Sequence, residues 1–331
     1  MRAIRVMSTG GPEVLGYGGA PDPRPEAGQL LVRVRAAGVN FIDTYYRAGL
    51  YPIGLPYIPG LEGAGEVVAL GPGAEDAGRF AVGQRVAWCD SPGSYAELAV
   101  VPSHRAVSVP EGVADELAGS SLLRGLTAHY LLYPSPTVPT GTSPQWRPGD
   151  TVLIHAGAGG VGLILTQLAK HAGLRVITTV SNDKKEMLSR AAGADDVLRY
   201  DDFAATVREL TDGRGVPVVF DGVGATTFDG SLAATAIRGT VVLFGAASGP
   251  VPPFDLQRLN PLGSLTVTRP TLAHFIADPE EFEWRAGAYL GAVVDGSVQA
   301  RVGLSYPLAD AAQAHRDLAS RRTIGTTVLL P

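Results

Sequence analysis

Cysteine is almost absent from this chain of 331 residues. Its single cysteine, Cys89, excludes an intramolecular disulfide framework and any site built from several thiolates, and it fits a reducing compartment. The six histidines are scattered, without the close pairing of metal ligands, at positions 104, 129, 155, 171, 274 and 315. A catalytic zinc needs about three Cys, His or carboxylate ligands, so the sequence predicts no metal site. His155 lies inside a strand-like run and is expected to be a hydrogen-bonded core residue.

Excess positive charge and long apolar runs are also missing. Lys and Arg number 27 against 32 Asp and Glu, which gives a formal charge of −5 and no basic surface for nucleic acid or anionic lipid. No run approaches the ~18 apolar residues of a membrane span, and residues 1–6 contain no apolar signal core. At 45% hydrophobic and 18% charged residues the chain can bury a substantial core. We therefore expect a soluble, cytoplasmic protein that binds neither nucleic acid nor membranes.

Glycine, in contrast, is abundant, and it divides the chain into short elements. The 42 glycines and 25 prolines separate short apolar runs, a pattern typical of many strands and tight turns. Strand-like runs at 30–36, 65–70 and 85–88 predict a compact β-barrel-like unit over residues 1–121. The proline-rich stretch 133–149 is expected to be an exposed loop.

Residues 122–294 have a different pattern, in which strands and helices alternate. Strands are expected at 151–156, 175–180, 216–221 and 240–244, and helices at 160–171, 183–192, 226–236 and 278–293. This alternation predicts βαβ crossovers and a doubly wound parallel sheet. Residues 295–331 return to short strands with one helix near 309–320, so the α/β domain is predicted to be inserted into the first domain.

A glycine-rich turn follows the first of these strands. Gly157, Gly159 and Gly162, with Gly160 and Val161 between them, satisfy G-x-G-x-x-G between a strand and a helix. The first glycine is expected to permit the tight turn, the second to let the backbone approach a pyrophosphate, and the third to let the helix pack on the strand. The helix N-terminus then offers N–H groups and a positive dipole to the phosphates. In this setting the motif favours dinucleotide binding over a turn formed only for packing.

The end of the next strand indicates which dinucleotide is bound. An NAD site usually has an acidic residue there that accepts a hydrogen bond from the ribose 2′-hydroxyl, whereas this chain has Ser181, followed by Lys184 and Lys185. A 2′-phosphate needs donors and positive charge, so NADP(H) is favoured. Asp183 argues against this assignment, although it comes late and could cap the following helix. The two lysines could also form only a solvated helix face.

Without a Lewis acid, alcohol oxidation is difficult, but the reduction of electrophilic acceptors is not. Quinones and α,β-unsaturated carbonyls accept hydride directly, and the nicotinamide carries that chemistry. The protein need only hold the cofactor against the acceptor and exclude water.

Stretches in both predicted domains resemble the zinc-free quinone oxidoreductases, the zeta-crystallin-like branch of the medium-chain dehydrogenase/reductases. The similarity is carried by residues 36–43, Tyr45, 49–52, 59–65, 125–132, 155–162, 263–265, 267–270 and 320–321. It implies a GroES-like β-barrel catalytic domain at 1–121 and 295–331, a Rossmann domain at 122–294, a homodimer, and NADPH between the two domains.

The resemblance also implies the residues of the site. Its cofactor-binding positions fall on Asn40, Phe41, Tyr45, Thr127, Gly160, Val161, Ser181, Lys185, Tyr200, Phe244, Gly245, Ala246, Ala247, Thr268, Arg269 and Arg321. Four of them, Ser181, Lys185, Tyr200 and Arg321, would surround the 2′-phosphate. Gly222 departs from the family, which often has serine there, and the loop 134–148 is longer than expected.

The catalytic candidates are Asn40, Tyr45 and Tyr51. Asn40 and Tyr45 are expected to donate hydrogen bonds to the developing enolate oxygen, and Tyr45 and Tyr51 to line the acceptor pocket. Alternatively, Asn40 is a turn residue, and the tyrosines are ordinary core or loop aromatics. Glu62 could be an acid or a carboxylate that accepts backbone hydrogen bonds, and it is left out of catalysis.

The predicted function is NADPH-dependent reduction of quinones by direct hydride transfer without a metal. Two alternatives remain at this stage. One is an NADPH-dependent reductase of alkenals, enones or enoyl thioesters, because acceptor choice depends on pocket shape. The other is an NADPH-binding protein without turnover.

Overall fold

The computed structural model describes residues 1–73, 78–135, 145–320 and 325–331. The chain divides into two compact units, one formed by residues 1–123, 282–295 and 300–331 and the other by residues 124–281 and 296–299. The grouping of residues 282–294 with the first unit differs from the expected boundary at 294, and the functional domain limits remain a prediction. Among the described residues, no helix is both long enough and apolar enough to cross a membrane.

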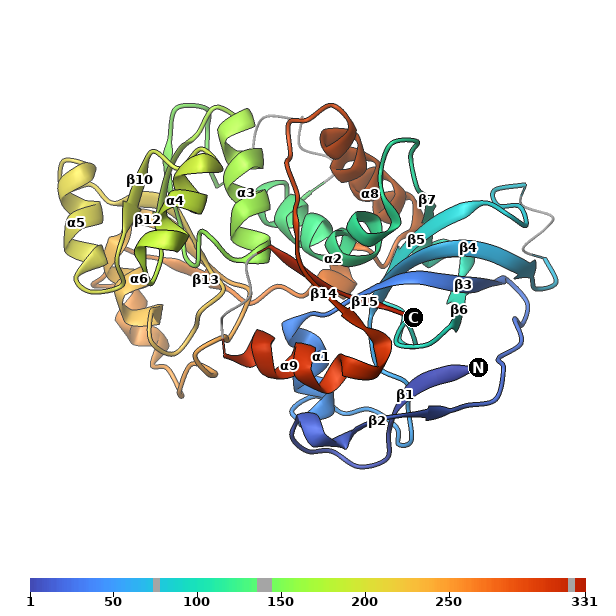
Figure 1. The fold of residues 1–331 in the computed structure, drawn as a ribbon. Coiled ribbons are helices and arrows are strands. Elements are labelled where there is room, and N and C mark those ends of the chain that lie inside the picture. Colours follow the sequence, from blue (N-terminus) through green and yellow to red (C-terminus); the bar gives the residue numbers. More distant parts are fainter. Residues whose placement is uncertain (74–77, 136–144, 321–324) are drawn as a thin grey trace. The chain divides into compact units, whose positions relative to one another are not determined.

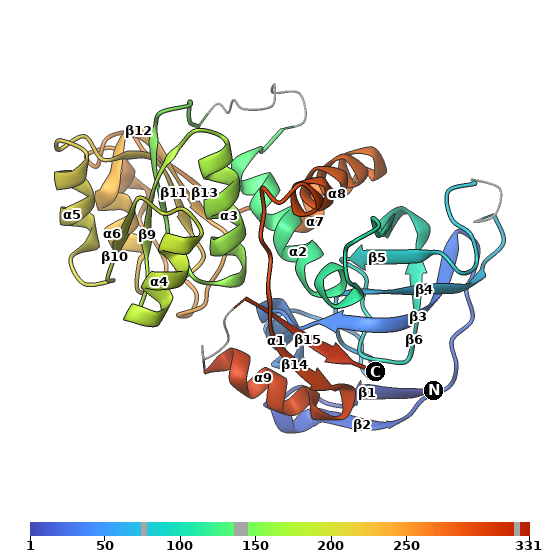
Figure 2. The same cartoon turned by 45° about the horizontal axis from the view of Figure 1, so that its top comes forward.

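The first unit is built around a seven-stranded sheet, whose strands can be followed in Figures 1 and 2. Its elements are β1 (Arg2–Val6), β2 (Leu15–Gly19), β3 (Gln29–Gly38), α1 (Phe41–Arg47), β4 (Glu62–Leu70), β5 (Arg85–Cys89), β6 (Leu98–Pro102), β7 (Ala106–Ser108), β14 (Val302–Pro307), α9 (Ala311–Ala319) and β15 (Thr326–Leu330). The sheet order is β14-β15-β3-β4-β5-β7, with β6 also paired to β3, and β1 and β2 form a separate hairpin. The C-terminal β15 pairs antiparallel with β3, so the two ends of the chain share this unit.

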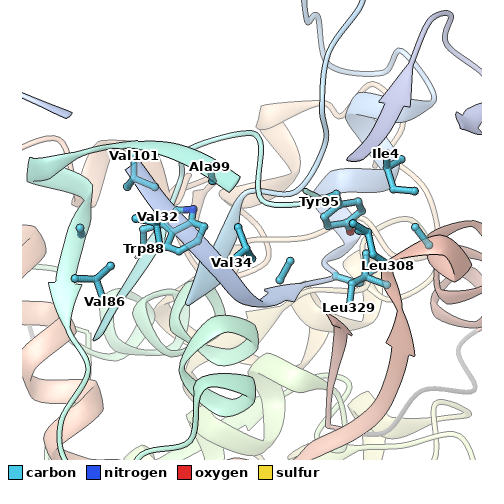
Figure 3. Packing of buried hydrophobic residues seen from close by; sticks show 14 of the residues in the cluster. Ile4, Val32, Val34, Val86, Trp88, Tyr95, Ala99, Val101, Leu308 and Leu329 are labelled. Carbon is cyan, nitrogen blue, oxygen red and sulfur yellow. The ribbon is translucent and has the colours of Figure 1, made fainter. Parts of the chain in front are cut away.

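The sequence of β3 explains how this sheet is anchored. Leu30, Val32 and Val34 are buried and alternate with the exposed Arg33 and Arg35, which is the two-residue period of a strand with one face on a core. Figure 3 shows this cluster, which also includes Trp88 and Val101 of neighbouring strands and, further along, Tyr95, Leu308 and Leu329. Residues from the C-terminal segment therefore complete the core of the N-terminal sheet.

The second unit contains a six-stranded parallel sheet of order β10-β9-β8-β11-β12-β13. Its elements are β8 (Thr151–Ile154), α3 (Gly160–His171), β9 (Arg175–Thr179), α4 (Asp183–Ala191), β10 (Asp196–Leu198), α5 (Phe203–Leu210), β11 (Val216–Asp221), α6 (Phe228–Ala234), β12 (Thr235–Leu243), β13 (Thr266–Thr268) and α7 (Leu272–Phe275). Two longer helices, α2 (Asp115–Leu132) and α8 (Pro279–Val294), each contain a boundary between the units.

The strand order of this sheet confirms the doubly wound arrangement. It reverses at β8, which lies between β9 and β11, and the crossover helices α3 and α4 lie on one face while α5 and α6 lie on the other (Figures 1 and 2). The central strands are buried on both faces, as expected for a covered parallel sheet. Such a switch point is where open α/β sheets bind ligands, outside the carboxyl ends of the strands.

Candidate functional site

The glycine-rich segment connects β8 to α3 at the switch point. Ala156 turns the chain with a φ of 53°, Gly159 is the N-cap residue, and α3 begins at Gly160. The Gly157 N–H donates to the Thr179 carbonyl oxygen at 3.0 Å, and the Gly159 N–H donates to that of Ala156 at 2.8 Å. The first N–H groups of a helix have no partner within it and, together with the helix dipole, attract phosphate.

Two glycines of this loop have no room for a side chain. A Cβ on Gly162 would lie 2.3 Å from the Ala156 carbonyl oxygen, and one on Gly157 would lie 2.5 Å from the Thr178 Cβ. The residue in the left-handed region is therefore Ala156, while Gly157, which lies within the turn expected of it, is needed for packing against β9. The close packing expected of Gly162 agrees with the geometry.

An arginine that the sequence analysis did not single out lies against this loop. A Cβ on Gly160 would lie 2.7 Å from the Arg124 Cδ and 2.9 Å from its Nε, so the Arg124 side chain covers the start of α3. Arg124 is buried on α2, one turn before the buried Thr127. A guanidinium there places positive charge beside the turn that the sequence predicts to bind phosphate. Arg124 lies 33–38 positions before the loop in the sequence, so no local pattern indicates that the two are in contact.

Two further turns meet at the carboxyl edge of the sheet. The turn after β11 contains Gly222, and the turn after β12 runs from Phe244 to Ala247. The two turns are joined by the Ala247 N–H, which donates to the Gly222 carbonyl oxygen at 3.3 Å. A Cβ on Gly222 would lie 2.7 Å from the Phe244 ring. The ring therefore occupies the space that a serine at position 222 would need, which accounts physically for the departure noted at this position.

The predicted 2′-phosphate residues follow the neighbouring strands β9 and β10. Ser181 is exposed, while Lys185 on α4 and Tyr200 after β10 are partly buried. The α4 helix is capped by Asn182, whose Oδ1 accepts from the Lys185 N–H at 2.9 Å, so the suggestion that Asp183 caps this helix was wrong. Arg321 lies outside the described residues.

The structure brings most of the predicted cofactor residues of the second unit to one edge. All strand pairs of this sheet are parallel, so the segments that follow β8, β9, β10, β12 and β13 leave the same side. This side collects Gly157–Gly162, Ser181, Tyr200, Phe244–Ala247, Thr268 and Arg269. Asn40, Phe41, Tyr45 and Tyr51 belong to the first unit, and their roles remain predictions.

A buried polar network lies beneath the phosphate loop. The His155 Nδ1 lies 2.8 Å from the Thr179 Oγ1, and its Nε2 lies 3.0 Å from the Ser231 Oγ. Ser231 donates to Asp221 at 2.7 Å, so its oxygen accepts from His155 Nε2–H, and Thr179 donates to Nδ1. These bonds join the ends of β8, β9 and β11, and they confirm the expectation that His155 is a hydrogen-bonded core residue.

Because two histidine side chains are buried in their neutral form, we expect the free energy of unfolding to decrease in mild acid. Burial lowers the pKa of His155 from its ordinary 6.5 to about 4, although Asp221 acts in the opposite direction, and burial, with Arg47, lowers the pKa of His315 to about 3. Between these values and 6.5 the unfolded chain binds more protons than the folded one. The two neutral histidines therefore make their full contribution to the free energy of unfolding above pH 6.5. Below that pH the free energy of unfolding decreases, by about 1.4 kcal/mol per pH unit for each histidine.

Proton NMR of the histidine ring hydrogens tests this expectation. Free histidine in the same buffer, with its ordinary pKa of about 6.5, is the reference. The signals of His155 and His315 should not move between pH 8 and 5.5 in the folded protein. A midpoint near 6.5 for either signal would contradict the described burial.

In the first unit, Asn40 lies between β3 and α1 and is fixed by two carboxylates. Its backbone N–H donates to the Asp43 Oδ2 at 2.8 Å, and its side-chain Nδ2 donates to the Glu62 Oε1 at 2.7 Å. Glu62 is fully buried and also accepts from the Leu123 N–H at 2.8 Å. A Cβ on Gly38 would lie 2.3 Å from the Glu62 Oε1, so that glycine makes space for the carboxylate. Of the two readings of Glu62, the structure supports a carboxylate that accepts hydrogen bonds.

Aromatic side chains gather on and after α1. The rings of Tyr45 and Tyr51 meet edge to face with centroids 5.6 Å apart, and Tyr46 and Tyr51 do so at 5.7 Å. Tyr51 of this cluster is 38% exposed, and Phe41 at the start of α1 is 36% exposed, so both present apolar ring surface to solvent. Flat aromatic surface of this kind suits a planar, conjugated ligand.

The described residues contain no group of three or more His, Cys, Asp or Glu side chains arranged to hold a metal ion. Cys89 is buried, and burial raises the pKa of its thiol well above the ordinary value. His155 and His315 are both engaged in buried hydrogen bonds. The ligand types that zinc needs are therefore present but not assembled in this part of the chain.

Comparison with known proteins gives matches over the whole chain. Residues 26–111 match the alcohol dehydrogenase GroES-like domain, and residues 160–286 match the zinc-binding dehydrogenase family. The chain is 45% identical to a quinone oxidoreductase of Pseudomonas aeruginosa, covering 100% of this chain and 99% of the relative. It is 38% identical to a 2-haloacrylate reductase of a Burkholderia species, covering 99% and 98%. A mycobacterial protein solved in complex with NADPH is 54% identical, with a TM-score of 0.94 and full coverage of both chains.

Proposed function

This chain belongs to the quinone oxidoreductases of the medium-chain dehydrogenase/reductase superfamily, and from that premise we propose that it reduces a small quinone with NADPH and without a bound metal. The proposed setting is the cytoplasm. The single observation that carries the cofactor assignment is the phosphate loop at the switch point of the second unit, where Gly157 and Gly162 have no room for side chains.

The residues at this edge fit a phosphorylated dinucleotide. The start of α3 offers N–H groups to a pyrophosphate, and the buried Arg124 adds a positive charge beside Gly160. Ser181, Lys185 and Tyr200 would hold the 2′-phosphate through hydroxyl and ammonium donors. Phe244 to Ala247, with Thr268 and Arg269, would contact the remainder of the cofactor. When bound, NADPH supplies a hydride that it carries itself.

The side chains of the first unit would serve the acceptor. The rings of Tyr45 and Tyr51, with that of Phe41, would bind a planar ring and exclude water. The Asn40 amide and the Tyr45 hydroxyl would donate hydrogen bonds to the acceptor oxygen as it gains negative charge. Because Glu62 accepts one of the Asn40 amide hydrogens, it sets which way the amide faces, and it is a positioning residue in this proposal.

A second acceptor class is favoured by one of the relatives. The 2-haloacrylate reductase is named for an acceptor in which a carbon–carbon double bond is conjugated to a carboxyl group. Such acceptors share with quinones an electrophilic carbon and an oxygen that gains charge when hydride adds, so the same donors would serve both.

A panel of acceptors tests the proposal. Small quinones, enals and 2-haloacrylate are assayed with NADPH and NADH, and primary alcohols with NADP+ and NAD+, all through the nicotinamide absorbance, before and after dialysis against a chelator. We expect turnover with quinones and NADPH that the chelator does not change. NADPH consumption only with 2-haloacrylate or enals would select the second class. Stoichiometric zinc together with alcohol oxidation would overturn the proposal.

We also propose that the chain acts as a homodimer. β13 is one of the two edge strands of the six-stranded sheet, and edge strands can pair with a second copy. Light scattering should give twice the chain mass of 34.4 kDa, and a concentration-independent monomer would contradict the dimer.

A further inference from the structure

An arginine beside the predicted 2′-phosphate residues binds two carboxylates of the next helix. Arg199 follows β10, and its Nη2 donates to the Asp183 Oδ1 and, at 2.9 Å, to the Glu186 Oε2. Asp183 and Glu186 lie in the first turn of α4. Hydrogen bonds from Arg190 and Arg199 lower the pKa of Glu186, so this carboxyl group is ionised at neutral pH.

Arg199 is held close to the segment that the proposed function assigns to the 2′-phosphate. The Val180 N–H donates to the Leu198 carbonyl oxygen at 2.9 Å, and Leu198 is paired with Thr179 in the parallel sheet. Arg199 directly after β10, and Val180 and then Ser181 after β9, therefore leave the same edge of the sheet on neighbouring strands. The side chain of Arg199 is 37% exposed, so its charge acts partly through solvent.

The charges at this edge would otherwise oppose a phosphate. Asp183 and Glu186 carry two negative charges on the helix that also supplies Lys185. A 2′-phosphate carries nearly two more, and such charges repel across distances within the Debye length, about 8 Å at physiological ionic strength. Arg199 offsets part of this repulsion. Its second amino group, Nη1, is buried and donates to no acceptor in the described part of the chain, so the two carboxylates do not use all of its donors.

We propose that Arg199 is a specificity-determining residue for the phosphorylated cofactor: it neutralises Asp183 and Glu186 so that a 2′-phosphate can bind beside them. The inference rests on the proposed function, which places the phosphate at Ser181, Lys185 and Tyr200. It also explains how the site tolerates Asp183, the residue that in the sequence argued against NADP(H). A dinucleotide without the 2′-phosphate gains nothing from this neutralisation.

Isothermal titration calorimetry with NADPH and NADH tests the role of Arg199 without turnover. Arg199→Gln should raise the Kd for NADPH about tenfold and leave that for NADH within about twofold. Adding Asp183→Asn and Glu186→Gln to that variant should restore NADPH binding to within about threefold of wild type. The matched control is Arg175→Gln at the opposite end of β9, where the arginine is paired with Asp196 and is 38% exposed. The Kd values of Arg175→Gln for NADPH and NADH should equal those of the wild type.

A second variant keeps the test independent of whether Arg199→Gln folds. Asp183→Asn/Glu186→Gln, with Arg199 retained, should tighten NADPH binding severalfold and leave NADH binding unchanged. Equal losses for both cofactors in Arg199→Gln, no change in either variant, or no recovery in the triple variant would each overturn the proposal. If one of these results is found while the wild-type protein still prefers NADPH, the role of Arg199 is wrong but the proposed function stands. If the wild-type protein binds neither dinucleotide, both the role of Arg199 and the proposed function are wrong.

Discussion

Alanine at position 162 is expected to abolish measurable NADPH binding and to lower the free energy of unfolding by about 2–4 kcal/mol. The added Cβ would lie 2.3 Å from the Ala156 carbonyl oxygen and 3.0 Å from both the Ala156 carbonyl carbon and the Gly157 Cα. All three are backbone atoms of the phosphate loop and cannot rotate away as a side chain would. Either α3 moves away from the loop or the loop opens, and both changes displace the N–H groups that a pyrophosphate would contact.

Gly291→Ala is the matched control for this substitution. Gly291 lies within α8, and a Cβ there meets nothing within 4 Å, so alanine should raise stability by about 0.5–1 kcal/mol through helix propensity. Calorimetric titration with NADPH and chemical unfolding measure both quantities on each variant. A Gly162→Ala protein that binds NADPH with wild-type affinity would show that the loop is not the phosphate site.

The alternating strands and helices of the second unit were predictable because their signals are local. The helix expected at 160–171 and the strand expected at 216–221 have those bounds in the structure. The helix expected at 226–236 ends instead at Ala234, because Thr235 pairs with Val216 of β11 and begins β12. A tertiary pairing thus ends that helix, and no periodicity in the sequence reports it.

Other elements gave no usable pattern. The long helix α2 is buried on most of its sides, so it lacks the polar face that identifies an amphipathic helix. The short helix α1 is fixed by tertiary hydrogen bonds of Asn40 and Asp43, which isolated propensity does not report.

The candidate site was predictable only where a motif or a resemblance marks it. The glycine spacing of Gly157–Gly162 predicts the phosphate loop. The position of Ser181 and Lys185 just after a predicted strand predicts their place beside the cofactor ribose. Arg124 and Arg199 contact residues 13 to 36 positions away and belong to no motif. Glu62 lies in a stretch that carries the resemblance, but its contacts with residues 22 and 61 positions away leave no local signal. Their roles depend on which charges the fold brings together, which only three-dimensional packing determines.

A buried chain of hydrogen bonds joins α1 to α9 within the first unit. The Arg47 Nη1 lies 3.1 Å from the His315 Nδ1, the His315 Nε2 lies 3.1 Å from the Tyr95 hydroxyl, and that hydroxyl donates to Asp43 at 3.2 Å. Because arginine only donates, Nδ1 accepts, and the ring hydrogen is on Nε2. Burial lowers the pKa of His315 to about 3 and raises that of Tyr95 well above its ordinary value. At neutral pH every hydrogen bond in this series is therefore donated in the same direction, from the Arg47 guanidinium towards the Asp43 carboxylate.

Arg47→Met is expected to lower the free energy of unfolding by about 3 kcal/mol, because it removes the cation from a buried chain that ends in a carboxylate. Asp43 accepts the Asn40 N–H, so the same change should loosen the start of α1 and lower kcat/KM for the acceptor. Adding Asp43→Asn removes the buried negative charge, and a double-mutant cycle by urea unfolding should give a coupling energy above about 1 kcal/mol. Arg35→Met is the control, since its ion pair with Glu66 is 51% and 39% exposed and should matter by less than about 0.5 kcal/mol. Additive effects of the two changes would mean that Arg47 acts only through its packing and its bond to the Gly10 carbonyl oxygen.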